Sequence, residues 1–386
     1  MIACRGSRRK GVFAVDELVF LNEVLVRALR DTVTEATTEN LRRAQLEGFQ
    51  FCSAEQGFPV CAHSGQGAVD GWLLALSPES VRRIVAFHTI FDAEVEAVEV
   101  TTAQGPEQAL AYVVSAETID DCTGAYNPDH APENVAVLSR AAAEMLMLAS
   151  THPTQALRAR WPMALAHAAS VERAKHEVDA SELRAPWTRD DVISVTEQQP
   201  YAWFFGVRED DLRFGQFDGA MGPLAKRAAF VMSDAVTVLP YDPKRDTVMV
   251  IEQFRFGPWL RGAKNCWLLE PIAGRVDPFE TPLDAALREA QEEARLSLDT
   301  DQLLPVGNVY PSPGAITEFL YQFVALCDLP DGVEGVAGLE GEAENIRSHV
   351  VPFQRLMDLI RTGEVQNGPL VLTAYWLDAY RARNRA

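Results

Sequence analysis

Three glutamates in the C-terminal half are the residues of this chain best placed to do chemistry. Glu289, Glu292 and Glu293 stand at i, i+3 and i+4, a spacing that crowds their carboxylates on one sector of a helix. Like charges so close destabilise a helix unless something offsets them, and a hard divalent cation takes carboxylate oxygens as ligands. The alternative explanation of the same spacing is a solvated acidic face on a surface helix.

The helix that would carry these glutamates is predicted to begin after Thr281. Thr281 is a suitable N-cap, Pro282 suits the first helical position, and Asp284 can complete a capping box. Apolar residues recur at helical spacing and predict the face that packs on the rest of the domain. These residues are Leu283, Leu287, Ala290 and Ala294.

Residues 274–298 resemble the Nudix box, the catalytic signature of the Nudix hydrolases. The matching residues are Gly274, Glu280, Arg288, Glu289, Ala290, Glu292, Glu293 and Leu296. One position departs from the pattern, because Arg295 stands where the family usually has its second Gly. The Arg-Glu-x-x-Glu-Glu core is intact, and its register with Gly274 and Glu280 is more demanding than a solvated acidic face requires.

The pattern around the box predicts an α/β fold. Apolar runs at 235–239 and 247–252 flank the sequence Asp-Pro-Lys-Arg-Asp, which signals a hairpin, and helices are predicted at 353–362 and 369–383. Mixed strands with a helix on each side form the Nudix α/β/α sandwich, with a mixed sheet, that the resemblance implies. We assign this domain to residues 186–386.

Several segments outside the box resemble the ADP-ribose pyrophosphatases. They are residues 251–255, 267–274, 312–318 and 338–351, of which Ser-Pro-Gly-Ala-Ile-Thr-Glu at 312–318 is the most discriminating. The resemblance implies Mg²⁺-dependent hydrolysis (Mn²⁺ is an alternative) of the pyrophosphate bond of ADP-ribose, giving AMP and ribose 5-phosphate. It also implies a homodimer whose N-terminal strands complete the partner's site.

The same resemblance implies roles for individual residues. The metal ligands would be Glu289, Glu293, Glu344 and the carbonyl of Ala273, with Glu292 and Arg288 as further catalytic residues. The general base would be Glu342, with Glu340 and Glu344 as close competitors. The substrate would be held by Phe204 on adenine, by Lys226 or Arg227 and Arg255 on phosphate or ribose, and by Arg275, Ser312, Gly314 and Glu318. Ala228 and Val231 replace two family glutamates, which leaves the substrate preference open.

Residues 1–117 are predicted to form a separate small domain, from short apolar runs between turn residues. The order of these runs resembles the γ-glutamylcyclotransferase-like (AIG2-like) β-barrel. The family's Tyr-Gly-x-Leu loop is replaced by Phe-Ala-Val-Asp-Glu-Leu at 13–18, and its acid–base Glu by His88. We therefore expect no cyclotransferase activity, and we expect His88 to be an ordinary packed or exposed side chain.

Residues 118–185 are predicted to form a helical connector that packs between the two domains. Helices are expected at 134–150 and 153–178, where Ala, Leu, Met, Arg and Glu dominate. The combination of an AIG2-like domain, a helical segment and a Nudix domain resembles the tellurite-resistance-associated Nudix proteins of bacteria. That association implies a phenotype, and nothing in the residues shows tellurite binding.

Composition narrows the possible partners. The 386 residues carry a net charge of −20, which argues against nucleic acid and anionic membranes because both favour basic patches. The six cysteines are scattered without a Cys-x-x-Cys pair, and neither a signal peptide nor a transmembrane run is recognised. These features favour reduced thiols, a cytoplasmic location and a small-molecule substrate.

Two other functions remain open at this stage. The chain could hydrolyse another nucleoside-diphosphate sugar, or it could be a catalytically weak nucleotide-sugar sensor that kept the fold. The intact glutamates weigh against the sensor, whereas Arg295 weighs mildly for it.

Overall fold

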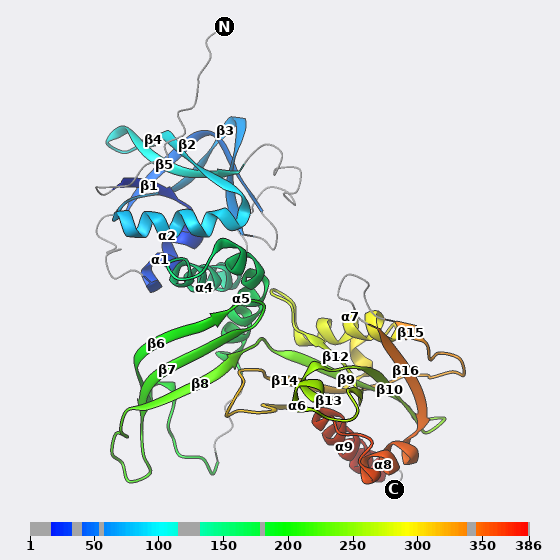
Figure 1. Cartoon of the computed structure of the whole chain (residues 1–386). Helices are drawn as coiled ribbons and strands as arrows, with labels where there is room; N and C mark the ends of the chain where they lie inside the picture. Colours follow the sequence, from blue (N-terminus) through cyan, green and yellow to red (C-terminus); the bar gives the residue numbers. More distant parts are fainter. Residues whose placement is uncertain are drawn as a thin grey trace. The chain divides into compact units, whose positions relative to one another are not determined.

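The computed structural model of the chain describes residues 17–32, 41–53, 58–114, 132–177, 182–337 and 345–384. The chain clusters into two units (Figure 1). The first contains Met1–Glu182 together with Gln198–Val207, and the second contains Leu183–Glu197 together with Arg208–Ala386. Because the second unit carries the Nudix-like segment, it is the one that positions the glutamates.

The first unit is built on a closed barrel with the strand order β1-β3-β2-β4-β5. The strands are β1 (Glu17–Leu21), β2 (Arg42–Ser53), β3 (Pro59–Leu76), β4 (Ala93–Thr102) and β5 (Gly105–Val114). Its helices are α1 (Glu23–Thr32), α2 (Pro78–His88), α4 (Pro132–Leu148) and α5 (Thr154–Ala174), with a short 3₁₀ turn, η3 (Thr89–Phe91), after α2. Ser77 caps α2 by accepting a hydrogen bond from the Ser80 N–H, as the sequence Ser-Pro-Glu-Ser favours.

Helices α4 and α5 share one hydrophobic core with the barrel. That core joins Val19, Ile84 and Tyr112 of the barrel and α2 to Met145 of α4 and Leu165 of α5. The sequence predicted a connector between two domains, whereas these helices cluster with the barrel because both bury large apolar faces against it. The domain limits 1–117, 118–185 and 186–386 stay predictions.

A buried ion pair explains why residues 198–207 belong to the first unit. Arg160 of α5 is fully buried. Its Nε donates to Glu144 at 2.8 Å and its Nη1 donates to the Phe204 carbonyl at 3.2 Å. Gln199 donates to the same Glu144 carboxylate at 2.8 Å. A buried guanidinium needs such partners, so these contacts fix the end of the hairpin that carries Phe204.

A three-stranded sheet precedes the main sheet in sequence. It has the order β6-β7-β8, formed by β6 (Val192–Ala202), β7 (Gly206–Phe214) and β8 (Ala225–Val231), with the 3₁₀ turn η4 (Arg189–Asp191) at its start. Apolar side chains on β6, including Val192, Ile193 and Val195, are about half exposed. This sheet therefore has apolar surface left to cover.

The main sheet of the second unit is mixed, as the sequence predicted. Its order is β13-β14-β9-β10-β16-β15, with β11 paired to β10 and β12 to β9. The strands are β9 (Ala235–Asp242), β10 (Thr247–Phe254), β11 (Trp267–Glu270), β12 (Ile272–Arg275), β13 (Leu303–Val309), β14 (Leu320–Leu326), β15 (Val336–Ala337) and β16 (Ile346–Pro352). Strands β14 and β9 run parallel, and the pairs around β10 are antiparallel.

Helices cover both faces of this sheet (Figure 1). They are α7 (Pro282–Ala294) on one face and α8 (Phe353–Thr362) and α9 (Gly368–Asn384) on the other. The short helix α6 (Phe256–Arg261) buries none of its residues, and the 3₁₀ turn η5 (Thr300–Gln302) precedes β13. Along β10, Met249 and Ile251 pack in the core shared with α7, whereas Val248 and Val250 pack in the core shared with α8 and α9. This alternation follows from the two-residue period of a strand, and it gives the α/β/α layering that the sequence predicted.

Asp242 stabilises the turn between β9 and β10 through hydrogen bonds. Its side chain is fully buried and accepts hydrogen bonds from the N–H groups of Lys244, Arg245 and Leu329 at 2.8 to 3.1 Å. Burial raises the pKa of Asp242, but these hydrogen bonds and the Arg245 guanidinium outweigh it and lower the pKa to about 2. The carboxylate therefore stabilises the fold chiefly when it is ionised.

Asp242→Asn is expected to lower the free energy of unfolding by about 2 kcal/mol at neutral pH, because charge-assisted hydrogen bonds are lost. Since the folded pKa lies below the ordinary value of 3.8, this stabilisation is complete above about pH 5 and is lost as the pH falls through 3.8 toward 2. Urea denaturation of both proteins between pH 7 and 3 measures this difference. Asp328→Asn, which removes an exposed pair with Lys244, is the control and should change little. A gap that stays constant with pH would contradict the assignment.

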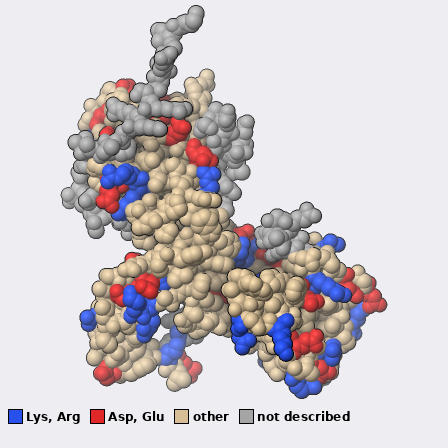
Figure 2. All heavy atoms as spheres, in the orientation of Figure 1, with Lys and Arg blue, Asp and Glu red and all other residues tan. Residues whose placement is uncertain are grey.

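Three further features concern membrane crossing, surface charge and the cysteines. No helix among the described residues is long and apolar enough to cross a membrane. On the face drawn in Figure 2, Lys and Arg are interspersed with Asp and Glu over the described residues, without a continuous basic patch. The cysteines within the described ranges, Cys52, Cys61, Cys266 and Cys327, are free thiols.

Candidate active site

The alanine face of α7 brings the glutamate helix close to the sheet. Ala285, Ala286, Ala290 and Ala294 are buried against the sheet. The sequence predicted that the buried apolar stripe of this helix begins at Leu283. This prediction is wrong for Leu283, because its side chain is 40% exposed. Small side chains let a helix approach its neighbour closely, so the tertiary contact selected the alanines over the larger leucine.

Both ends of α7 are defined by specific residues. Thr281 caps the start by accepting from the Asp284 N–H at 3.2 Å, as predicted, while its hydroxyl donates to the Asp284 carboxylate at 2.6 Å. At the other end Arg295 takes a left-handed conformation with φ 55°. The N–H groups of Arg295 and Leu296 then close the helix on Gln291 and Ala290. Arg295 thus adopts a left-handed backbone conformation that costs glycine less free energy.

Glu293 and Glu289 both lie against strand β12. Glu293 is 3% exposed, and its carboxylate accepts a hydrogen bond from the Ala273 N–H at 2.9 Å. Glu289 lies so close to the next residue that a Cβ added to Gly274 would stand 1.8 Å from its Oε1. A larger residue at position 274 would therefore displace the Glu289 carboxylate, and both glutamates lie over the backbone of β12.

Arg288 ties the loop between β12 and α7 to the glutamates. Its Nε donates to Glu280 at 3.0 Å, and its Nη1 donates to Glu289 at 2.6 Å and to Glu292 at 3.1 Å. Its Nη2 donates to the Arg275 carbonyl at 2.9 Å. Burial lowers the pKa of Arg288, but the carboxylates of Glu280 and Glu289 outweigh burial and raise it. The guanidinium stays charged and orients the acidic side chains around it.

The donor set of this cluster fits a hard divalent cation. Glu289 and Glu293 present carboxylate oxygens beside the Ala273–Gly274 backbone, and Mg²⁺ prefers oxygen ligands of this kind. No group of three or more His, Cys, Asp or Glu side chains within the described ranges has the geometry of a complete metal site. Glu342 and Glu344, together with their competitor Glu340, lie outside the described residues, so their predicted roles as base and ligand stay predictions.

A second polar cluster surrounds Arg255. Its guanidinium makes a bidentate pair with the buried Glu270, with contacts of 2.9 Å from Nε and 2.5 Å from Nη2. Burial raises the pKa of Glu318, the positive charge of Arg255 lowers it, and Asp234 raises it further. The sequence predicted Arg255 and Glu318 as substrate residues but missed Glu270 and Asp234. A lone acid in the apolar strand Trp-Leu-Leu-Glu was the available signal for Glu270.

The segment that contains Ser312 and Gly314 is held against the end of β8. The Ser312 carbonyl accepts from the N–H groups of Ala315 and Ile316. The Phe230 N–H donates to the Ala315 carbonyl, and the Thr317 N–H donates to the Phe230 carbonyl. The Thr317 hydroxyl accepts from the Met232 N–H at 2.8 Å. Gly314 has open space around it. These contacts place Glu318 at the edge where β14 begins.

The remaining predicted substrate residues are Lys226, Arg227, Phe204 and Arg275, and their surroundings differ. Lys226 of β8 pairs with Glu209 and Asp211 of β7 at 2.9 and 3.3 Å. Arg227 lies over the Phe214 ring at 5.7 Å. Phe204 is 41% exposed and belongs to the first unit. Arg275 is exposed at the end of β12 and joins the glutamate cluster through its carbonyl. The second unit thus brings together Ala273, Arg275, Arg288, Glu289, Glu292 and Glu293.

Parts of this chain are similar to known proteins. Residues 232–372 match the family described as NUDIX domain. An ADP-ribose pyrophosphatase of Haemophilus influenzae is 33% identical over half of this chain and 88% of its own length. One from Escherichia coli K12 is 32% identical over 50% of this chain and 90% of its own length. A GDP-mannose pyrophosphatase of Escherichia coli O1:K1 is 32% identical over 39% of this chain and 77% of its own length.

A solved structure described as an ADP compounds hydrolase covers 54% of this chain and all of its own, with 19% identity and a TM-score of 0.40. A similarity of that size adds nothing to the argument.

Proposed function

Because the chain belongs to the Nudix family, we propose that it hydrolyses the pyrophosphate bond of ADP-ribose to AMP and ribose 5-phosphate. The observation that carries this proposal is the fixed pair Glu289 and Glu293 over the Ala273–Gly274 backbone. The relatives at 32 to 33% identity, which match half of this chain, support ADP-ribose as the substrate. A GDP-mannose pyrophosphatase at 32% identity makes another nucleoside-diphosphate sugar the second candidate.

The cofactor we propose is Mg²⁺, held by Glu289, Glu293 and the Ala273 carbonyl. A bound divalent ion supplies charge for the pyrophosphate oxygens and lowers the pKa of water. The chain's own residues do the rest of the positioning. Arg288 holds Glu289 and Glu292 in place through two hydrogen bonds from one nitrogen. The buried Glu293 is oriented by the Ala273 N–H, so its second oxygen can face a ligand.

Substrate recognition is proposed for the Arg255 cluster. Arg255 carries a permanent positive charge, and its side chain is 41% exposed despite the bidentate pair with Glu270. The pair holds the guanidinium plane in one orientation. The exposed part of the guanidinium therefore suits a planar group or a phosphate oxygen as a partner. Glu318 has a raised pKa because of burial, and it can offer a hydrogen bond to a sugar hydroxyl.

We also propose a homodimer. The support is the β6-β7-β8 sheet, whose Val192, Ile193 and Val195 are 44 to 53% exposed. Burial of such apolar surface lowers the free energy. A second copy of the chain would bury it in a symmetric interface. We propose the cytoplasm as the location of such an enzyme, because four cysteines in the described residues form no disulfide, as suits a reducing compartment.

A turnover screen tests the substrate assignment. ADP-ribose, GDP-mannose and other nucleoside-diphosphate sugars are compared at equal concentration with Mg²⁺, and AMP and ribose 5-phosphate are identified as products. ADP-ribose is expected to give the highest kcat/KM. A higher value for GDP-mannose would transfer the assignment to the second candidate, and no turnover of any substrate would favour the sensor.

For the N-terminal barrel we propose an AIG2-like domain without cyclotransferase activity, in a domain combination that resembles the tellurite-resistance-associated proteins. His88 is 3% exposed, its Nδ1 is paired with the Ile84 carbonyl at 2.9 Å, and its ring stacks on Tyr112 at 4.1 Å. Burial lowers the pKa of His88 to about 4, against a smaller opposing effect of the Ile84 carbonyl. His88 is thus packed, which is one of the two ordinary outcomes, packed or exposed, that the sequence favoured. Residues 13–16 of the replaced loop lie outside the described residues.

The full chain is therefore expected not to release 5-oxoproline from γ-glutamyl dipeptides at pH 7. A chromatographic assay for 5-oxoproline, with and without the chain, measures this. Product above the background of a His88→Gln variant would show that the barrel is catalytic and the chain bifunctional.

A further inference from the structure

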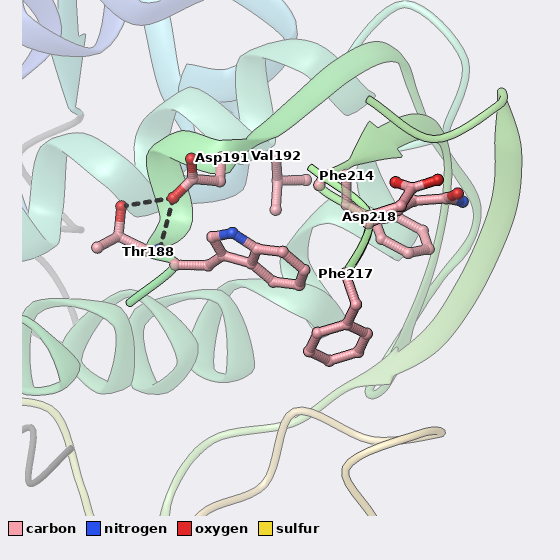
Figure 3. A pocket seen from close by; sticks show the side chains of 9 residues that line it. Thr188, Asp191, Val192, Phe214, Phe217 and Asp218 are labelled. Carbon is pink, nitrogen blue, oxygen red and sulfur yellow. Dashed lines mark hydrogen bonds between the residues drawn. The ribbon is translucent and has the colours of Figure 1, made fainter. Parts of the chain in front are cut away.

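A pocket of about 490 Å³ lies at the start of the β6-β7-β8 sheet, within the second unit. It is separate from the glutamate cluster, because none of its lining residues belongs to β12 or α7. Figure 3 shows Thr188 and Asp191 on one side of the pocket and Phe217 and Asp218 on the other. The lining residues are Trp187, Thr188, Asp191, Val192, Phe214, Gly215, Gln216, Phe217 and Asp218. A pocket of this volume is large enough for a small organic molecule.

Aromatic rings dominate the apolar part of the pocket. The rings of Trp187 and Phe217 lie 4.8 Å apart at an angle of 34°, and both are exposed, by 41% and 92%. Gly215 lies beneath the indole, where an added Cβ would already be in contact with the Trp187 ring at 3.5 Å. The backbone therefore approaches the indole closely on one side and leaves its other surface to the pocket.

The charged groups that line the pocket are both acids. Asp191 accepts from the Thr188 N–H at 2.8 Å, and Asp218 accepts from the Ala220 N–H at 2.9 Å. Each carboxylate is thereby held by the backbone of its own turn. The nine lining residues include no Lys or Arg; Arg227 lies over the Phe214 ring, which itself lines the pocket. Negative charge beside exposed aromatic faces is the combination that attracts organic cations.

We propose that this pocket binds a small organic cation, with an ammonium group against the exposed side of the contacting Trp187–Phe217 ring pair and near the carboxylates of Asp191 and Asp218. The rings supply cation–π attraction and apolar contact, and the carboxylates supply the charge that selects a cation. An anionic nucleotide is disfavoured there because it would face the two carboxylates. The pocket is thus a second ligand site, distinct in charge preference from the pyrophosphate site.

The test compares three probes of similar size and different charge. Benzyltrimethylammonium, benzyl alcohol and benzenesulfonate are titrated into the full-length protein by calorimetry at constant ionic strength, because salt screens exposed charges. We expect the cation to bind at roughly millimolar concentration, and the sulfonate not to bind measurably. Equal binding of all three probes, or binding of none, would overturn the proposal.

Matched variants assign any binding to the pocket. Trp187→Leu is expected to weaken the cation by at least about fivefold, whereas Trp187→Phe should retain part of the affinity because it keeps an aromatic face. Asp191→Asn and Asp218→Asn keep an acceptor for the turn hydrogen bonds and remove only the charge, so together they should weaken the cation severalfold and leave benzyl alcohol unchanged. Trp259→Leu, an exposed aromatic outside the pocket, is the control. An effect of Trp259→Leu equal to that of Trp187→Leu would show surface adsorption and refute the site.

Discussion

Glu293→Gln is expected to lower kcat for ADP-ribose by about 10³-fold or more while the fold is retained. The expectation follows from the several kcal/mol that a metal contributes, with each 1.36 kcal/mol worth a factor of ten. Glutamine keeps one oxygen that can accept from the Ala273 N–H, so the backbone contact survives while the ligand charge is lost. Stopped or continuous assays at increasing Mg²⁺ measure kcat, and the far-UV circular dichroism spectrum checks the fold.

Two further glutamate substitutions provide a parallel test and a control for this experiment. Glu289→Gln should behave like Glu293→Gln, because both side chains lie against the same backbone. Glu364→Gln changes an exposed glutamate outside the cluster and should leave kcat unchanged. If well-folded Glu289→Gln and Glu293→Gln variants keep kcat within tenfold of the parent at saturating Mg²⁺, the assignment of the active site is wrong.

Gly274→Ala is expected to lower kcat by about 10²-fold or more, although it adds only one methyl group. The added Cβ would stand 1.8 Å from Glu289 Oε1 and 1.9 Å from its Cδ. The carboxylate must therefore move, and a misplacement of about 1 Å can cost 10²-fold in rate. The effect tests the position of Glu289 without changing any charged group.

Gly368→Ala is the matched control for this substitution. Nothing lies within 4 Å of a Cβ added at Gly368, and alanine favours the start of α9. Its kcat should equal that of the parent. The melting temperatures of both variants show whether a loss of rate is a loss of fold. A stable Gly274→Ala variant with normal kcat would mean that Glu289 does not act from the position seen here.

The local parts of the site could be predicted from the sequence because local chemistry determines them. The spacing of Glu289, Glu292 and Glu293 places them on one sector of any helix. Thr281 begins that helix through its side chain, and the charged turn Asp-Pro-Lys-Arg-Asp separates β9 from β10. Helix α8 spans Phe353–Thr362 as predicted. None of these features depends on a distant contact.

Tertiary structure decided which partners those residues have. Arg255 meets Glu270, 15 residues away, only because β10 and β11 pair side by side. The alanines of α7, and not Leu283, face the sheet because the helix packs close to it. Arg295, which the sequence alone counted mildly against catalysis, takes the left-handed backbone of the glycine it replaces. Such outcomes depend on strand pairing and packing distance, which no local pattern encodes, so only the folded chain settles them.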